Sequence, residues 1–125
     1  MNLSNFLTLK AIVSLMFALA LILVPGWIMS IFGVNLAETG KFITQLFGVD
    51  MMAIGFVCWY SRKSTDILVA DIALGIFIAD AIGSVIMLVG QLKGLMNPLG
   101  WLNVVLWLFL TIGIGYFRFL RPKAS

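Results

Sequence analysis

Three of the four aspartates lie well inside long apolar stretches of the sequence, and these three are the residues that could do chemistry. Asp50 falls in an apolar run at about 40–60, and Asp71 and Asp80 fall in a run at about 66–92. Inserting a carboxyl group into a lipid bilayer costs free energy, so a carboxyl group at such a position indicates a functional site by default. The depth of each carboxyl in the membrane decides what it can meet.

Asp50 and Asp80 come to a similar depth if both runs are helices. Counted from the turn between the runs at about 1.5 Å per residue, Asp50 is about 15–18 Å deep and Asp80 about 20 Å deep. On antiparallel neighbours the two carboxyls would meet at mid-membrane, where both cannot ionise cheaply. With Ser84 and Asn103 they would form a site for a ligand, an ion or a shared proton. The structural alternative is a protonated carboxyl that is hydrogen-bonded to Ser84, Ser14 or Asn103.

Asp71 lies nearer the membrane surface, a turn or two inside the boundary. A helix turns by about 100° per residue, so Asp71 and Asp80 fall on opposite faces and cannot form one site. Lys10, in the first apolar run, comes to a depth similar to that of Asp71. The sequence therefore predicts an ion pair between Lys10 and Asp71, or an Asp71 side chain that reaches toward Arg62.

The residue types that most catalytic and metal sites need are missing. The chain has no histidine, and Cys58 is its single cysteine. A Ser-His-Asp triad, a histidine metal ligand and a thiolate zinc cluster are therefore excluded. No glycine-rich phosphate loop occurs, and the eight basic residues do not cluster as nucleic-acid binding requires. We expect no catalytic residue, no metal, no cofactor and no nucleic acid; an enzyme that uses a carboxyl pair alone is the weakest alternative.

The composition indicates that lipid surrounds the chain. Apolar residues make up 62% of the 125 residues, and charged residues only 10%, whereas soluble domains average about 45–50% and about 25%. A soluble chain of this length could not bury so much apolar surface. A bilayer core is crossed by about 20 apolar residues in a helix. Four runs reach that length, at about 6–31, 40–60, 66–92 and 98–120.

The connections between the runs decide the predicted topology. Pro25 should kink or end the first helix, because its ring removes a backbone donor. Asn97 followed by Pro98 predicts the start of the fourth helix. Short connections make consecutive helices antiparallel neighbours. The sequence thus predicts an all-α integral membrane protein, with residues 1–125 forming one domain, an up-down-up-down four-helix bundle.

Positive charge gathers on one side of this predicted bundle. That side holds both termini and the middle turn, with Lys10, Arg62, Lys63, Arg118, Arg121 and Lys123. The turns on the other side are nearly neutral, with Glu38, Lys41 and Lys93. The positive-inside rule places the positive side in the cytoplasm. We therefore expect a multi-pass protein of the cell membrane with both termini cytoplasmic.

Small residues mark the faces where helices are expected to pack closely. Gly75, Ala79 and Gly83 follow one another at four-residue spacing, and such a stripe lets another helix backbone approach. The partner helix belongs either to the same bundle, which is the simpler interpretation, or to another chain. Gly48 and Gly55 form a similar flat strip on the second helix, at heptad spacing and roughly opposite Asp50.

Three amide side chains lie toward the outer half of the predicted bundle. Gln45, Asn97 and Asn103 could line an outward-facing pocket together with Trp101 and Trp107. Amides near an interface are more often solvated or hydrogen-bonded to a helix end, so these two interpretations stand beside the pocket.

The sequence also resembles a known group of membrane proteins. The segments Leu46–Asp50, Gly55 and Trp59–Arg62 resemble the second helix of small DoxX-like membrane proteins, and Val24–Trp27 and Asn97–Trp101 fit the same outline. The resemblance covers most of the chain as a pattern of glycines and helix ends, and it implies a four-helix fold. That group is functionally mixed and includes some subunits of membrane redox complexes, so the resemblance implies no binding residue.

Two functions are compatible with these observations. The first is a non-enzymatic accessory or scaffold subunit in the bilayer that packs against a larger membrane partner or against copies of itself, with room to hold a lipid or a quinone-like molecule. The second is a homo-oligomeric small transporter, or an ion or proton pathway, that uses Asp50 and Asp80. Because four helices enclose little space, such a pore would need several copies.

Overall fold

All regular structure in the described part of the chain is helical. A computed structural model describes residues 2–64 and 67–120. The helices are α1 (Leu3–Leu23), α2 (Pro25–Ile31), α3 (Glu38–Ser61), α4 (Ile67–Leu92) and α5 (Gly100–Gly115), and α5 runs on into the π-helix η1 (Tyr116–Leu120). Four helices are long and apolar enough to cross a membrane: α1, α3, α4, and α5 together with η1. The prediction of an all-α chain with four candidate spans is therefore confirmed.

The helix boundaries differ from the predicted ones mainly at the prolines. The first predicted helix is divided at Val24, just before Pro25, which starts the short helix α2. The last predicted helix begins at Gly100 and not at Pro98. The Asn97 side chain accepts a hydrogen bond from the Leu99 backbone at 3.0 Å, in a turn that precedes the helix.

Some predicted features fall beyond the described residues. These are the predicted start of the third helix at residue 66 and the basic residues Arg121 and Lys123.

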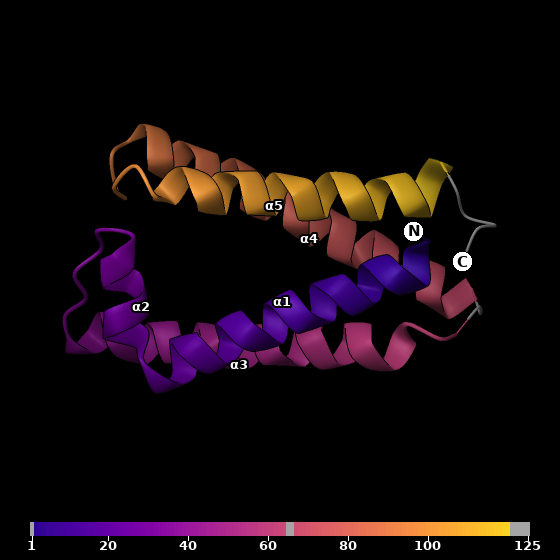
Figure 1. The fold of residues 1–125 in the computed structure, drawn as a ribbon, viewed down its shortest axis with the longest axis horizontal. Coiled ribbons are helices and arrows are strands. Elements are labelled where there is room, and N and C mark those ends of the chain that lie inside the picture. Colours follow the sequence, from indigo (N-terminus) through magenta and orange to yellow (C-terminus); the bar gives the residue numbers. More distant parts are fainter. Residues whose placement is uncertain (1, 65–66, 121–125) are drawn as a thin grey trace.

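The long helices form two pairs, α1 with α3 and α4 with α5 (Figure 1). Glycine lets α3 come close to α1: a Cβ atom at Gly48 would lie 3.0 Å from Leu21, and one at Gly55 would lie 2.8 Å from Leu15. Gly48 and Gly55 thus face α1. As a result α3 packs on α1 and hardly on α4, its successor in sequence.

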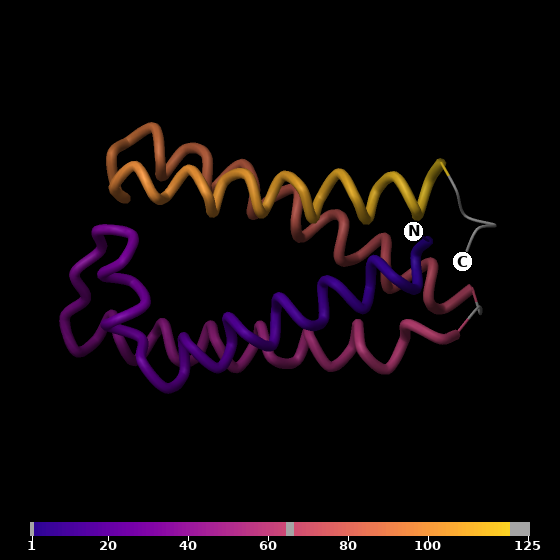
Figure 2. Tube along the Cα trace, in the orientation of Figure 1, coloured from indigo at the N-terminus to yellow at the C-terminus, as the bar shows by residue number. Residues whose placement is uncertain are grey.

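The two pairs meet at one end and diverge toward the other (Figure 2). The core lies where they meet, around Phe6, Leu7, Ile114 and Phe117. At the opposite end, Asn97 donates two hydrogen bonds to the end of α2. Its side-chain amide donates to the Ile31 carbonyl at 3.0 Å, and its backbone N–H donates to the Phe32 carbonyl at 2.8 Å. The pairs are thus joined at both ends.

The predicted small-residue stripe of α4 is divided between two environments. The Trp107 indole covers Gly83, where a Cβ atom would lie 2.7 Å from Trp107 Cε3. Gly75 and Ala79 are exposed, and a Cβ atom at Gly75 would have nothing within 4 Å. One end of the stripe is therefore a contact within the chain, and the other end is open.

Candidate functional site

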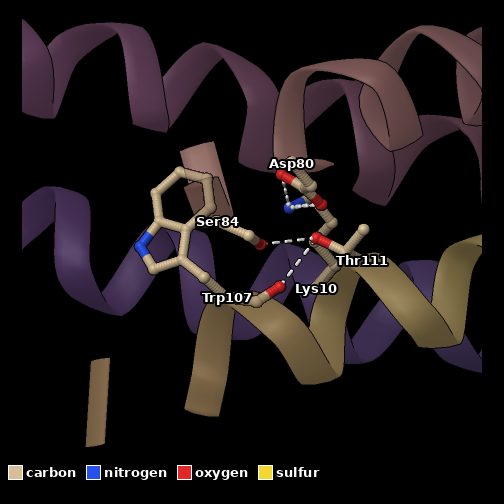
Figure 3. A network of polar contacts seen from close by, with 5 residues as sticks. All are labelled: Lys10, Asp80, Ser84, Trp107 and Thr111. Carbon is tan, nitrogen blue, oxygen red and sulfur yellow. Dashed lines mark hydrogen bonds and ion pairs between the residues drawn. The ribbon is translucent and has the colours of Figure 1, made fainter. Parts of the chain in front are cut away.

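A buried ion pair joins the two helix pairs. Lys10 Nζ on α1 lies 2.7 Å from Oδ2 and 3.0 Å from Oδ1 of Asp80 on α4 (Figure 3). The two side chains are only 5% and 7% exposed. Ammonium and carboxylate therefore neutralise each other away from the surface, at about the middle of α4.

The predicted ion pair between Lys10 and Asp71 is wrong, because the structure pairs Lys10 with Asp80. Asp71 is exposed on α4. The two aspartates lie on opposite faces of α4, and the face that carries Asp80 is the one turned toward α1. The prediction compared depths along the helix axes, but the long lysine stem reaches a deeper acid on the correct face.

The predicted pairing of Asp50 with Asp80 is also wrong. Asp50 is exposed, whereas Asp80 is buried against Lys10. The physical reason is the glycine strip of α3: Gly48 and Gly55 turn one face of that helix onto α1, and Asp50 lies on the opposite face. The carboxyls share a depth but not a direction, so they form no joint site.

Ser84 ties α4 to α5 rather than binding Asp80. Its hydroxyl lies 3.0 Å from the hydroxyl of Thr111, which in turn donates to the Trp107 carbonyl at 2.8 Å. Since Thr111 donates there, Ser84 is the donor in the first bond. Figure 3 shows these contacts next to the ion pair. Ser84 is therefore a structural hydroxyl beside the site.

A cavity of about 430 Å³ opens between the two helix pairs, next to the ion pair. Its wall is mainly aromatic and aliphatic, with Phe17, Phe47, Met51, Met87, Trp107 and Leu110 among the lining residues. Four polar side chains also line it: Lys10, Ser14, Thr44 and Asn103. Among the predicted site residues, Asn103 thus lies at the cavity, whereas Asp50 and Ser84 do not.

The polar groups of the cavity have few partners in the chain. Ser14, Thr44 and Asn103 form no side-chain hydrogen bond with any described residue, although Ser14 is only 5% exposed. Thr8 and Thr111, by contrast, donate to the carbonyl one turn earlier in their own helices. The cavity therefore combines an apolar wall with unused hydrogen-bonding groups.

The predicted outward-facing pocket is only partly realised. Asn103 and Trp107 line the cavity, but Trp101 is 45% exposed and does not. Gln45 donates to the Ile22 carbonyl at 2.9 Å, and Asn97 donates to a carbonyl at the end of α2. Gln45 and Asn97 thus bind helix ends, which was the alternative interpretation.

Sequence reasoning gave Ser14 only a supporting role and did not single out Thr44. One signal was available: Lys10 and Ser14 are four residues apart, and this spacing puts both on one face of a helix. No sequence signal showed that this face borders a cavity. Within residues 2–64 and 67–120, no group of three or more histidine, cysteine or acidic residues could hold a metal ion.

Comparison with protein-family models, with curated proteins and with solved structures finds no match for this chain. The function must therefore be argued from the site itself.

Proposed function

We propose that the chain is a multi-pass protein of the cell membrane, folded as an up-down-up-down bundle with both termini and the middle turn in the cytoplasm. Support comes from the four apolar helices and from the charge distribution. The N-terminus, the end of α3 and η1 share one end of the molecule (Figure 1). Arg62, Lys63 and Arg118 belong to that end, and the positive-inside rule assigns such an end to the cytoplasm.

In that membrane, we propose, the chain is a non-enzymatic accessory subunit that packs against a larger membrane partner. The observation that carries this proposal is Asp50, an exposed carboxyl halfway along α3. Its neighbours Leu46, Val49 and Ile54 are 52%, 53% and 40% exposed, so the surface around it is apolar. A charged side chain at the bilayer centre costs about 2.5–3.5 kcal/mol. Coverage by a partner that donates hydrogen bonds to Asp50 removes this cost.

The chemistry of Asp50 favours a different protein over a second copy. An isologous dimer centred on Asp50 would bring two identical carboxyls together, since both subunits present the same patch. A partner helix with a lysine, arginine or amide opposite Asp50 has the complementary chemistry. Gly75 and Ala79 offer a second open surface, on α4, where another helix backbone can approach.

A photo-crosslinking experiment at native expression level tests this proposal. A benzophenone amino acid replaces Ile54, beside Asp50, or Met16 on α1, which is 66% exposed and serves as the matched control. We expect a protein adduct from position 54 and only lipid adducts from position 16. An adduct with a second copy would show self-association instead. Only lipid adducts at both positions would refute docking on this face.

The pathway hypothesis has lost the geometry on which it depended. Asp80 is neutralised by Lys10, and Asp50 faces away from it. We therefore do not propose a transporter. Membership of the DoxX-like group stays a prediction from the sequence.

A further inference from the structure

Lys10 and Ser14, which line the cavity, have donor capacity that the described part of the chain does not use. The Lys10 ammonium has three N–H donors, and both of its hydrogen bonds within the described part of the chain end on the Asp80 carboxylate. One turn further along α1, Ser14 is a buried residue that lines the cavity, and its hydroxyl forms no hydrogen bond with a described residue. A buried donor without an acceptor costs free energy. An acceptor from outside the chain therefore fits this part of the cavity.

The rest of the cavity selects an apolar body. Its volume of about 430 Å³ is within the range of about 300–1,000 Å³ that small-molecule sites occupy. Along α1 its lining extends from Lys10 to Leu21, a length of about 16 Å at about 1.5 Å per residue. Phe17, Phe47 and Met87 are among the apolar residues that line it. The occupant is therefore long, with a hydrocarbon body.

The ion pair decides the charge of the occupant. Asp80 already neutralises Lys10, so a carboxylate ligand would add an uncompensated negative charge in a low-dielectric site. A pure hydrocarbon would leave the donors of Lys10 and Ser14 unsatisfied. An uncharged oxygen atom avoids both costs.

We infer that this cavity binds a long, uncharged apolar molecule whose carbonyl or hydroxyl oxygen accepts hydrogen bonds from Lys10 and Ser14. This inference is independent of the docking at Asp50, because the two features lie on different surfaces. The oxygen can belong to a free molecule or to the acyl ester of a membrane lipid. The experiment separates these two sources.

Trp107 provides the readout, because its indole lines the cavity. Trp27, Trp59 and Trp101 are 64%, 36% and 45% exposed, so replacing them with phenylalanine leaves one fluorophore without disturbing the core. The protein is placed in nanodiscs and titrated with three brominated ligands of the same chain length. These are the alkane tetradecane, the methyl ketone tetradecan-2-one and the carboxylate tetradecanoate. Bromine quenches indole fluorescence only on close approach. We expect the ketone to quench at about tenfold lower concentration than the alkane, the gain from about one buried hydrogen bond.

Two variants assign the hydrogen bond. Ser14→Ala should reduce the preference for the ketone over the alkane several-fold. Ser84→Ala is the matched control, since it also removes a buried serine hydroxyl but one that bonds Thr111 outside the cavity. It should leave the preference unchanged. Nanodiscs of ether-linked phospholipid lack the acyl carbonyl, so ketone binding that is stronger there than in ester-linked discs identifies the membrane lipid as the natural source.

The ligand series is decisive even if Ser14→Ala does not fold. Equal quenching by ketone and alkane in both kinds of disc, tighter binding of tetradecanoate than of the ketone, or no quenching by any of the three would overturn the inference.

Discussion

Removing one member of the buried ion pair should destabilise the protein far more than removing both. Lys10→Met leaves the Asp80 carboxylate buried without its cation, and Asp80→Leu leaves the ammonium buried without its anion. Breaking a buried pair in this way costs about 3–5 kcal/mol, because one charge stays uncompensated. The double variant replaces both groups with apolar side chains of similar volume. Its free energy of unfolding should lie within about 1 kcal/mol of that of the wild type, or above it.

The magnitude follows from where the pair lies. Both side chains are more than nine-tenths buried, and both carboxylate oxygens are within 3.0 Å of Lys10 Nζ. The exposed pair of Lys41 with Glu38, at 3.1 Å, is the matched control, with side chains that are 40% and 92% exposed. Exposed ion pairs contribute about 0–1 kcal/mol. Glu38→Gln should therefore change stability little.

The assay is unfolding in mixed detergent micelles, followed by circular dichroism as the denaturing detergent is increased. The four proteins of the cycle and the Glu38→Gln control are compared under one condition. A double variant whose loss equals the sum of the two single losses would refute the argument, since the two groups would then act independently. Single losses no larger than that of Glu38→Gln would show that water reaches the pair.

Two further predictions concern packing and topology. Gly83→Leu should destabilise the protein by about 1–3 kcal/mol, because the new side chain overpacks the Trp107 indole that covers this glycine. Gly75→Leu should be tolerated in the isolated protein, because nothing lies within 4 Å of its Cβ position. Equal melting temperatures for the two variants would contradict the contact at Gly83. In a Cys58→Ala background, Lys63→Cys should react with a membrane-impermeant thiol reagent only from the cytoplasmic side and Lys93→Cys only from the outside, and labelling of both from outside would overturn the orientation.

Much of the fold could be predicted because each prediction needed only local information. The four spans follow from the length of apolar runs, and the break before Pro25 follows from the missing backbone donor. These features depend on residues that are neighbours in sequence. Distant contacts hardly alter them.

The candidate site was harder to predict because it depends on rotation about each helix axis. Residue counting gives depth, so Asp50 and Asp80 were placed at one level. It does not give the direction in which each side chain points. The direction of Asp50 is set by the strip of Gly48 and Gly55, which packs on α1. The prediction assumed that α3 packs on α4, its successor in sequence, but α3 packs on its predecessor α1 and hardly on α4.

The choice of partner for Lys10 links the fold to the proposed function. Three aspartates lie in the helices α3 and α4, and Lys10 forms its ion pair with Asp80. The pair constrains the rotation of α4 relative to α1, because the two side chains meet only when the face of α4 that carries Asp80 is turned toward α1. Asp71 is exposed on the opposite face of α4, and Asp50 is exposed halfway along α3. Because Lys10 pairs with Asp80, it does not neutralise the Asp50 carboxyl, and the proposed accessory role rests on a partner that supplies a hydrogen-bond donor to Asp50.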